Sequence, residues 1–370
     1  MQRPLFLLAC LLTLYTTGMS CKKDSKPSSS GDDNWPADSI RVVADQLSFP
    51  WEILWGPDNH IWMTERGGRI SRIEPKSGDI FPLLTISEVR SNGEGGLLGM
   101  ALHPSFPQQP YVYVVYNYDR NGDYREKVVR YTYGNNTLAS PRVLLDNINA
   151  SGIHNGSRLL VSPDNKLWIT TGDASSSQDA QDTSLPNGKV LRINLDGSVP
   201  ADNPFPGNPV WSYGHRNPQG LVLVNDKLYA SEHGPNIEDE VNIIEKQRNY
   251  GWPQVNGPCD GGENTFCTRY NVKTPIWSSG NSTVATSGMD YYNKDRISQW
   301  SNSLLLTTLK SQRLYQLQLS PDGDRVTSSA TWFTNAFGRL RDVCISPAGR
   351  VYLCTSNGSN DKVIEISSLK

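Results

Sequence analysis

The chain has 370 residues and a net charge of −2, so it lacks the excess of basic residues that nucleic-acid binding or attraction to an anionic membrane requires. Its 31 glycines and 24 prolines supply many turns, while 16 tyrosines and 10 tryptophans favour strands. No long segment shows the 3.6-residue periodicity of an amphipathic helix, which disfavours folds that alternate strands with helices. Composition and periodicity together predict an all-β protein.

The N-terminal segment has the features of an export signal. A positively charged start precedes an apolar run over residues 5–15 that is too short to span a bilayer, so residues 1–20 are predicted to be a signal peptide. Small residues come directly before Cys21, as in the lipobox of bacterial lipoproteins, and residues 21–38 then read as a polar, flexible tether. We expect an exported bacterial lipoprotein of the periplasm, outer membrane or cell surface, bound to the membrane only through its lipid anchor. Gly18 replaces the aliphatic residue that a lipobox prefers, so an ordinary secretory signal is the alternative.

One pattern recurs six times along the rest of the chain. An apolar strand, a turn, a second strand that ends in Thr or Ser, and a polar loop follow one another, with turns near residues 57, 106, 163, 225, 296 and 347. Repeats of this size, each with about four short strands, are typical of a β-propeller. Residues 39–370 are therefore predicted to form a six-bladed β-propeller of four-stranded antiparallel blades, whose ring is closed by an N-terminal strand over residues 39–47. A pair of β-sandwiches is the alternative, which six similar units disfavour.

Four cysteines beyond Cys21 are disulfide candidates, because an exported chain meets an oxidising compartment. Cys259 and Cys267 bracket the loop DGGENTF, which a disulfide would hold closed. Cys344 and Cys354 flank a turn and are placed to face each other across a hairpin, with buried free thiols as the alternative. No zinc-site spacing occurs.

Polar residues at equivalent strand ends form a candidate site. In a β-propeller the loops that follow the inner strands meet at a central channel, so residues far apart in sequence converge there. The candidate set is Glu94, His154, Asp173, Arg216, Asn217, Lys310, Arg339 and Arg341. Cations gathered in one axial pocket repel one another unless an anion lies among them. The set therefore predicts a polyanionic small molecule held by the arginines, although each cation taken alone is more often a solvated surface charge.

His154 and Asp173 have the arrangement of a general base and its partner. His154 comes just before a predicted strand, and Asp173 follows the end of the next strand. A carboxylate that orients one ring nitrogen leaves the other free to accept a proton. A histidine alone in a turn is more often structural, so the prediction depends on Asp173.

Oxygen ligands for a metal ion occur in a later loop. Gly234 and Pro235 offer two backbone carbonyls, and Glu240 and the carbonyl of Tyr250 offer further hard oxygen atoms. Such a set suits calcium, although the spacing of an EF-hand is absent.

The chain resembles a known family in its ordered motifs. GLLGMALHPSF, HNGSRL with TTGD, YGHRNPQGL, SEHGPN, NYGWP, TLK and RLRDV follow one another in the order found in the soluble quinoprotein glucose and aldose sugar dehydrogenases. The resemblance covers about residues 40–366. It implies a six-bladed propeller that binds pyrroloquinoline quinone (PQQ) and calcium. It also implies oxidation of aldose sugars at the anomeric carbon to lactones, with hydride transfer to the quinone.

The resemblance also implies roles for single residues. His154 matches the catalytic base and Asp173 its partner. The positions that match quinone contacts are Glu94, Arg216, Asn217, Lys310, Arg339 and Arg341. Those that match calcium ligands are Gly234 and Pro235 for the catalytic ion, and Glu240 and Tyr250 for a second, structural ion. Glu94 departs from the Gln that is common in the family, and a carboxylate facing a tricarboxylate cofactor puts that contact in question.

Two other functions compete with this interpretation. A non-catalytic extracellular binding module needs no His154 and no convergent cations. A calcium-dependent lactonase-type hydrolase needs several carboxylate and amide side chains around one axial metal, whereas the axial set here is cationic. For the dehydrogenase, the expected partners are an aldose substrate and a small or protein electron acceptor, in a monomer or homodimer.

Overall fold

The computed structural model describes residues 35–369 apart from residue 37. The predicted signal peptide, Cys21 and nearly all of the tether lie outside the described residues. In this described part of the chain, no helix is long and apolar enough to cross a membrane. From Asp38 onward the chain forms one structural unit.

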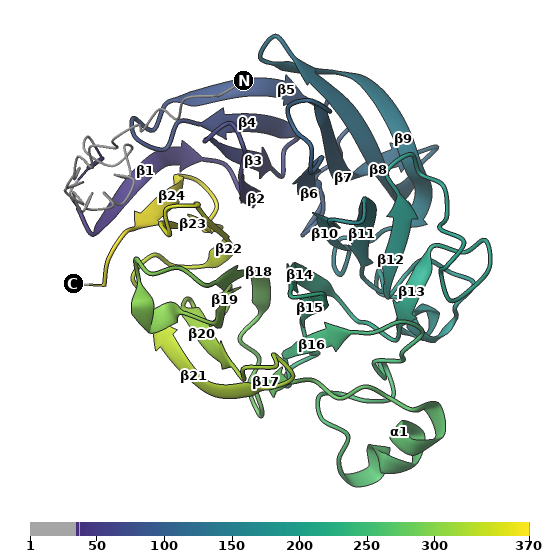
Figure 1. The fold of residues 1–370 in the computed structure, drawn as a ribbon. Helices are drawn as coiled ribbons and strands as arrows, with labels where there is room; N and C mark the ends of the chain where they lie inside the picture. Colours follow the sequence, from purple (N-terminus) through teal and green to yellow (C-terminus); the bar gives the residue numbers. More distant parts are fainter. Residues whose placement is uncertain (1–34, 37, 370) are drawn as a thin grey trace, which may run out of the picture. The chain divides into compact units, whose positions relative to one another are not determined.

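Six four-stranded antiparallel sheets are arranged as a ring around a central axis (Figure 1), which confirms the predicted six-bladed β-propeller. We number the sheets as blades, and within each the innermost strand is given first. Blade 1 contains β2 (Pro50–Trp55), β3 (Ile61–Glu65), β4 (Arg69–Ile73) and β5 (Ile80–Thr85). Blade 2 contains β6 (Leu97–Leu102), β7 (Tyr111–Arg120), β8 (Asp123–Gly134) and β9 (Thr137–Asn149). Blade 3 contains β10 (Gly156–Val161), β11 (Lys166–Thr171), β12 (Lys189–Asn194) and β13 (Val210–Tyr213).

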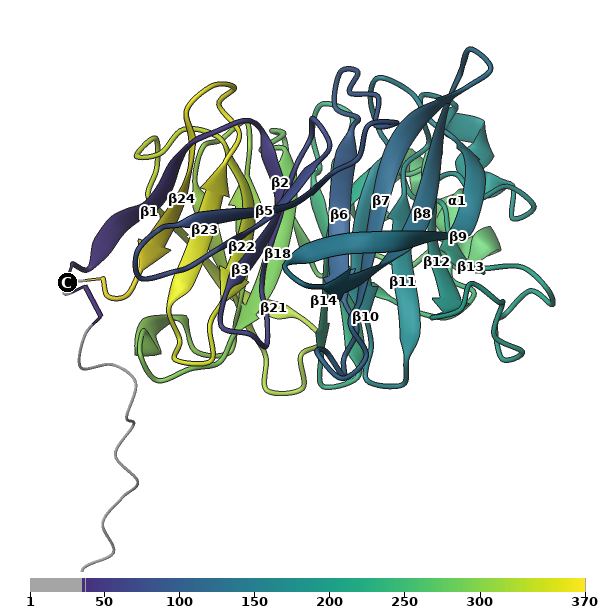
Figure 2. The same ribbon diagram turned by 90° about the horizontal axis from the view of Figure 1, so that it is seen from above.

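The remaining blades follow the same order. Blade 4 contains β14 (Pro218–Val224), β15 (Lys227–Glu232), β16 (Glu240–Ile244) and β17 (Trp277–Ser278). Blade 5 contains β18 (Thr286–Tyr292), β19 (Ser303–Thr308), β20 (Leu314–Leu319) and β21 (Val326–Trp332). Blade 6 contains β22 (Leu340–Ile345), β23 (Val351–Thr355), β24 (Asp361–Ile366) and the early strand β1 (Ile40–Leu47). Seen from the side, the strands run between the two faces of the ring (Figure 2).

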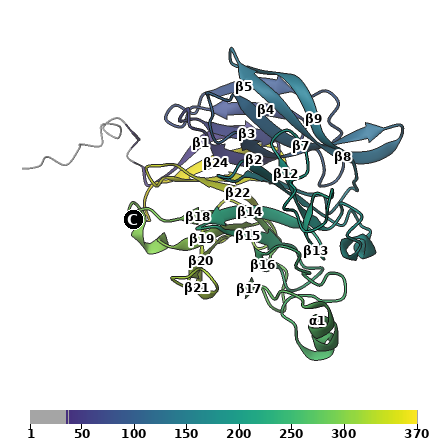
Figure 3. The same cartoon turned by 45° about the vertical axis from the view of Figure 1, so that its right-hand side comes forward.

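Helices are few and short in the described residues. They are η1 (Ser177–Gln181), η2 (Gly261–Glu263), α1 (Asn264–Tyr270) and η3 (Ser298–Trp300). Helix α1 lies outside the ring next to blade 4 (Figure 3). It belongs to the insertion around Cys259, whose length the sequence indicated but whose helix had no periodic pattern long enough to predict.

Strand β1 closes the ring, as the sequence predicted. It pairs antiparallel with β24, from Ile40 opposite Ile366 to Leu47 opposite Asp361. The first and last strands of the propeller therefore share one sheet, so opening the ring requires breaking their backbone hydrogen bonds. With β1 as its outer strand, blade 6 has four strands, as the other five blades do, and β24 is paired on both sides.

The hydrophobic core is divided among the junctions between blades. Six clusters of buried apolar side chains occur in the described propeller, and each joins neighbouring blades. Trp62 of blade 1 packs in one cluster with Tyr116 of blade 2, and Leu305 of blade 5 packs in another with Leu353 of blade 6. Each fully buried side chain of this size stabilises the fold by about 1.5–3 kcal/mol. The strands are thus apolar on both faces, because each blade is covered by two neighbours.

The same irregularity occurs in every blade, between the innermost strand and the second strand. The register of each of these six pairs shifts near the start of the inner strand. A β-bulge of this kind bends the strand and re-aims the side chains at the shift. The side chains located there include Glu52, Arg158, Gln219, Ser287 and Arg341. They contact one another across blades, so the bulges turn these residues toward the axis.

The two predicted cysteine pairs have different outcomes. Cys259 and Cys267 form a disulfide. The suggested pairing of Cys344 with Cys354 is wrong, because both thiols are free and buried. Strand register gives the reason: Cys344 lies opposite Tyr352 and Cys354 opposite Asp342, so the two cysteines are not cross-strand neighbours. Burial raises the pKa of both thiols and keeps them protonated.

The closing strand supplies a first test. Leu47 is 1% exposed in the core between blades 6 and 1, so we expect Leu47→Ala to lower the free energy of unfolding by about 2–5 kcal/mol. Val42 on the same strand is 49% exposed, and Val42→Ala should lower it by less than about 1 kcal/mol. Urea unfolding of both variants measures the difference. Equal losses would show that burial of β1 does not hold the ring closed.

Candidate active site

His154 and Asp173 lie in contact at one end of blade 3. His154 Nδ1 is 2.9 Å from Asp173 Oδ1, and the two side chains are 15% and 2% exposed. His154 lies in the turn before β10 and Asp173 follows β11, so the antiparallel pairing of these strands brings the residues together. When the proton is on Nδ1 and forms a hydrogen bond to the carboxylate, Nε2 is unprotonated, and its lone pair is free to accept a proton.

The Asp173 carboxylate is held from several sides. The Trp252 indole nitrogen donates to Oδ2 over 2.9 Å, and the backbone N–H of Ser175 donates to Oδ1 over 2.9 Å. The backbone N–H of Asp173 in turn donates to the carbonyl oxygen of Arg216 over 2.8 Å. These bonds come from two blades and fix the carboxylate, and through it the plane of the imidazole. Trp252 belongs to NYGWP, one of the motifs that carry the family resemblance, but only the structure shows its contact with Asp173.

The turn that carries His154 has an unusual backbone. His154 has a φ of +58°, in the left-handed region that few non-glycine residues adopt. At Gly172 a Cβ atom would lie 1.9 Å from the carbonyl oxygen of His154, so only glycine allows this close approach. The backbone N–H of His154 donates to Glu94 Oε2 over 3.2 Å. The glycine in TTGD and the carboxylate from blade 2 therefore both position the histidine.

A buried acid lies behind this turn. Glu126 on β8 is 1% exposed, and its Oε2 accepts hydrogen bonds from Ser157 Oγ at 2.5 Å and Asn117 Nδ2 at 3.4 Å. Burial raises the pKa of Glu126 to about 8, against the opposing effect of these two hydrogen bonds. At neutral pH the side chain is therefore largely uncharged.

Arg216 and Arg341 approach the axis from different blades. Arg341 is 5% exposed, and its Nη1 donates to Gln219 Oε1 over 2.7 Å and to Ser287 Oγ over 3.2 Å. Burial lowers the pKa of Arg341 to about 10; Glu94 opposes the shift, while Arg339 and Arg158 add to it. Burial also lowers the pKa of Arg216, against the effect of nearby carboxylates led by Asp173. The Nε atoms of both arginines are buried and have no hydrogen-bond partner in the described protein.

Buried Asn217 and half-buried His233 also leave polar atoms unused near these arginines. Asn217 is fully buried; its Oδ1 accepts from the backbone N–H of Gly156 over 3.0 Å, but its Nδ2 has no partner among the described residues. His233 Nε2 is likewise buried without a partner there. Burial lowers the pKa of His233, Asp239 and Glu94 oppose the shift, and Arg341 and Arg216 add to it. Unused polar atoms around a cationic pocket fit a polar anion better than water alone.

Sequence reasoning missed His233 and Arg66, although both follow the second strand of a blade. Arg66 comes directly after β3 and His233 directly after β15. These positions in their blades are nearly equivalent to that of Asp173, which follows β11 in blade 3. Burial lowers the pKa of Arg66, and Glu94 is the first group that opposes the shift. Aligning the repeats position by position would have found both residues.

Glu94 lies among these cations. It acts electrostatically on Arg66, Arg216, His233 and Arg341, and in each case its charge favours the protonated form. Its carboxylate therefore offsets part of the positive charge of the pocket.

The structure does not bring Lys310 and Arg339 into the buried cluster. Both side chains are exposed. Lys310 is fixed through its backbone N–H, which donates to the carbonyl oxygen of Val284 over 3.1 Å. Arg339 Nε donates to the carbonyl oxygen of Ser356 over 3.2 Å, and its charge reaches Arg341 and Arg66 only through space. Both residues lie in loops, and their exposure keeps them outside the buried cluster.

The residues predicted to hold two calcium ions all line one small cavity of about 10 Å³, which has room for about one water molecule or ion. Gly234, Pro235, Glu240 and Tyr250 share it with Glu232 and Glu238. Burial raises the pKa of Glu240 to about 8, and Glu232 adds to the shift. The Oδ1 atom of Asn256, another lining residue, is buried with no donor from the described residues. Acceptor oxygens in excess of donors fit a hard cation.

No ready-made cluster of acidic, histidine or cysteine ligands accompanies this cavity. Within the part of the chain that the structure describes, no three such side chains are grouped as a metal site. An ion there would therefore need backbone carbonyl and amide oxygens as well as carboxylates. The Tyr250 side chain is already used, since its hydroxyl donates to the carbonyl oxygen of Ile243 over 2.6 Å and its ring stacks on His215. The predicted ligand is the backbone carbonyl of Tyr250, which these contacts do not involve.

The buried acid behind His154 leads to a test of pH dependence. Its pKa is higher in the folded chain than the ordinary value of 4.5, so folding favours the protonated form and stability falls as pH rises from about 5 to about 8. Glu126→Gln keeps the shape of the side chain but does not titrate. The free energy of unfolding of this variant, minus that of the unchanged protein, should therefore increase from pH 5 to pH 8. Urea unfolding at pH 5 and pH 8 measures this. Asp45→Asn, at an exposed carboxylate on β1, is the control; a constant Glu126→Gln difference would contradict the shift.

Comparison with known proteins is consistent with this geometry. The family described as Glucose / Sorbosone dehydrogenase matches residues 47–364. Quinoprotein glucose dehydrogenase B of Acinetobacter calcoaceticus is 33% identical over 410 residues, covering 86% of each chain. Aldose sugar dehydrogenase YliI of Escherichia coli (strain K12) is 31% identical over 347 residues, covering 87% of this chain and 91% of that one.

A solved structure supports the same assignment. The PQQ-bound form of aldose sugar dehydrogenase from Streptomyces coelicolor has a TM-score of 0.76 and 31% identity to this chain, covering 89% of this chain and 99% of that one. The family match spans all six blades. The chain therefore belongs to the glucose/sorbosone dehydrogenase family, as its motifs indicated.

Proposed function

We propose that the protein oxidises aldose sugars at the anomeric carbon to lactones, with PQQ and calcium as cofactors. The observation that carries the proposal is the His154–Asp173 pair, 2.9 Å apart, together with half-buried Arg216 and buried Arg341, whose buried Nε atoms lack partners in the described chain. The names of the relatives, which include a quinoprotein and a PQQ-bound enzyme, support the choice of cofactor.

The chain offers donors for the acidic groups of the quinone. Arg216, Arg341 and Asn217 each have a buried nitrogen without a partner in the described residues, and these nitrogens would donate to carboxylate or carbonyl oxygens. Glu94 limits the mutual repulsion of the cations when no anion is bound. Lys310 and Arg339 would contribute from the loops that carry them, outside the buried cluster.

His154 would take the proton of the reaction. Oxidising a hemiacetal to a lactone removes a proton from the anomeric hydroxyl and a hydride from the anomeric carbon. PQQ, when bound, supplies the acceptor for the hydride. Nε2 of His154 would receive the proton, and Asp173 would stabilise the resulting imidazolium while holding the ring in place.

The oxygen-rich cavity would hold calcium. We assign the carbonyl groups of Gly234 and Pro235 to the catalytic ion, and the carboxylate of Glu240 with the carbonyl group of Tyr250 to the second, structural ion. Asp239 orders this loop: its Oδ1 accepts from the backbone N–H of Gly234 over 2.8 Å, and its Oδ2 accepts from that of Ala285 over 2.7 Å. A fixed loop keeps the carbonyl groups of Gly234 and Pro235 in one arrangement.

We also propose export and lipid anchoring through Cys21. The support is the N-terminal sequence alone: an apolar run of signal-peptide length followed by small residues and a cysteine.

Titration of the cofactor-free protein tests the proposed activity directly. We expect reduction of a redox dye by a panel of aldoses to require both PQQ and calcium, added together. Dye reduction by no aldose under these conditions would reject the dehydrogenase and favour a binding module. Lactone hydrolysis with calcium alone would favour the hydrolase.

The base is tested by replacing His154. We expect His154→Ala to lower turnover by a factor of roughly 100 to 10,000, the usual range for a positioned general base, while quinone binding changes little. His60→Ala, at a histidine on blade 1 outside the site, is the matched control. Steady-state kinetics and quinone titration separate the two effects. A His154→Ala protein that keeps most of its turnover would make the histidine structural.

The cationic pocket is tested by replacing Arg341. We expect Arg341→Ala to weaken quinone binding roughly ten- to a hundredfold, because it removes a charge-assisted hydrogen bond. Calorimetry on the cofactor-free protein measures this, with Arg325→Ala on an exposed turn as the control. Thermal unfolding shows whether the variant is folded. An unchanged quinone affinity in the folded variant would place the anion elsewhere.

A further inference from the structure

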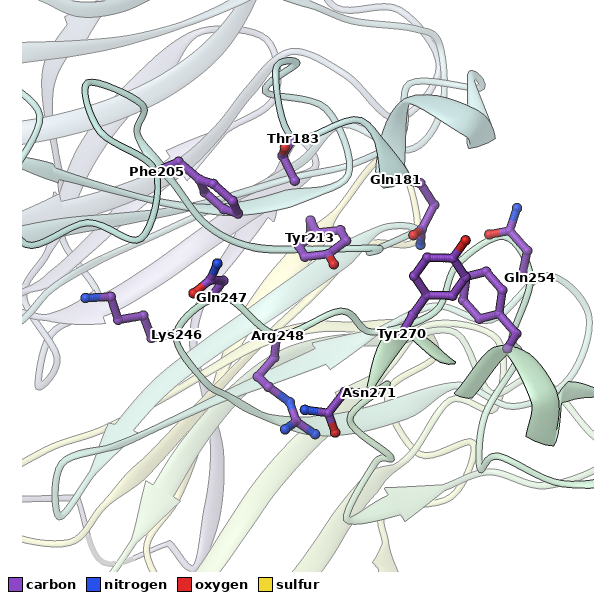
Figure 4. Close-up of a pocket in the computed structure, with 11 residues that line it drawn as sticks. Gln181, Thr183, Phe205, Tyr213, Lys246, Gln247, Arg248, Gln254, Tyr270 and Asn271 are labelled. Atoms are coloured by element: carbon purple, nitrogen blue, oxygen red, sulfur yellow. The ribbon is translucent and has the colours of Figure 1, made fainter. Parts of the chain in front are cut away.

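A groove of about 840 Å³ lies on the outside of the ring, away from the inner strands (Figure 4). Its walls are the outer strand of blade 3 at Tyr213, the loop after β16 and helix α1. Its volume lies in the range of ligand-binding sites. The described residues that line it are aromatic, amide, hydroxyl and cationic, and none of them is acidic. The quinone, calcium and base proposed above do not use these residues.

One wall of the groove is a rigid aromatic pair. Phe266 and Tyr270 lie one helical turn apart on α1, with ring centroids 4.4 Å apart and planes at 37°. The Cys259–Cys267 disulfide ties α1 to the preceding loop, which fixes this short helix in place. Tyr270 is nevertheless 42% exposed. An exposed aromatic ring on a fixed support offers a flat apolar surface with little loss of conformational entropy on binding.

Amide side chains in the groove are free to bond a ligand. The side chains of Gln247, Gln254 and Asn271 make no hydrogen bond to any described residue, and Gln247 and Gln254 lie at opposite sides of the groove in Figure 4. Gln181, by contrast, is locked by two hydrogen bonds with Asn249, of 3.0 and 2.8 Å. The groove thus combines a fixed floor with several unused groups that both donate and accept. A ligand rich in hydroxyl groups matches such a set.

The charge of the groove is positive and incompletely neutralised. The nearest acid to Arg248 is Glu245, whose Oε2 lies 3.7 Å from Arg248 Nε, beyond hydrogen-bond distance. Glu245 binds Lys273 more closely, at 2.5 Å. Arg248 Nε is buried and has no hydrogen-bond partner among the described residues. In Figure 4 the Arg248 guanidinium lies beside the Asn271 amide, so one carboxylate would be able to bond both.

We propose that this groove binds an acidic oligosaccharide that contains uronic acid units. A pyranose ring would pack its apolar C–H face on Tyr270, beside Phe266. The hydroxyl groups of the sugar would bond the free amides, and the carboxylate would pair with Arg248. The groove volume of about 840 Å³ has room for more than one sugar unit. The proposal does not depend on the proposed oxidation, because no group of that site takes part.

Calorimetry with trigalacturonate tests the proposal on the full chain, without cofactors. Maltotriose, a neutral chain of the same length, should bind at least about tenfold more weakly, because it lacks the carboxylates. Tyr270→Ala and Arg248→Gln should each weaken trigalacturonate binding roughly tenfold, and Arg248→Lys should restore part of the loss. Phe81→Ala and Arg325→Gln are the controls, since Phe81 is also 42% exposed and Arg325 is exposed on a distant turn.

Several results would overturn the proposal. They are the absence of binding at millimolar trigalacturonate, equal affinity for maltotriose, and an affinity that Tyr270→Ala and Arg248→Gln leave unchanged. Sedimentation velocity tests whether a second copy of the chain occupies the groove instead. If Tyr270→Ala changes the oligomeric state, the groove is a contact between two copies of the chain, and the saccharide proposal is wrong.

Discussion

The repeated β-bulge on the inner strands is the constraint on which the axial chemistry depends. A regular strand sends alternate side chains into the two neighbouring blades, and none toward the channel. The register shift in each blade breaks this alternation at one place, near the start of the inner strand. Arg158, Gln219 and Arg341 lie at these shifts and contact one another's blades. Six equal bulges thus give an apolar fold a polar axis without changing its core.

The same device produces two arginines with different roles. Arg158 Nη1 lies 2.6 Å from Glu52 and 3.0 Å from Asp342, and these carboxylates raise its pKa although burial lowers it. Arg341 has amide and hydroxyl partners instead, and its pKa falls to about 10. A buried guanidinium paired with two carboxylates holds blades together, whereas one with neutral partners still attracts an anion. The number of carboxylates beside each guanidinium therefore separates Arg158, which links blades through ion pairs, from Arg341, whose charge is paired with no carboxylate of the described residues.

Much of this arrangement was predictable from local sequence pattern. Six similar units predicted six blades, the early strand without a partner predicted the closure, and strand ends predicted that His154 and Asp173 would meet. What depends on register or burial was not predictable: Cys344 and Cys354 are offset across their hairpin, and Lys310 and Arg339 are exposed outside the buried cluster. Trp252 reaches Asp173 from 79 residues away, and no local pattern encodes such a contact.

The loop around Trp252 joins the dyad to the outer groove. Its indole binds Asp173, and its carbonyl oxygen accepts from Gln181 Nε2 over 2.6 Å in the groove floor. Arg216 lies over the same indole, 5.2 Å from the ring centroid. One loop after β16 therefore braces the base, a cation of the candidate active site and the wall of the proposed saccharide site. Hydrogen bonds through Trp252 therefore connect Gln181 in the groove floor with Asp173 of the dyad, so the two regions share one rigid support.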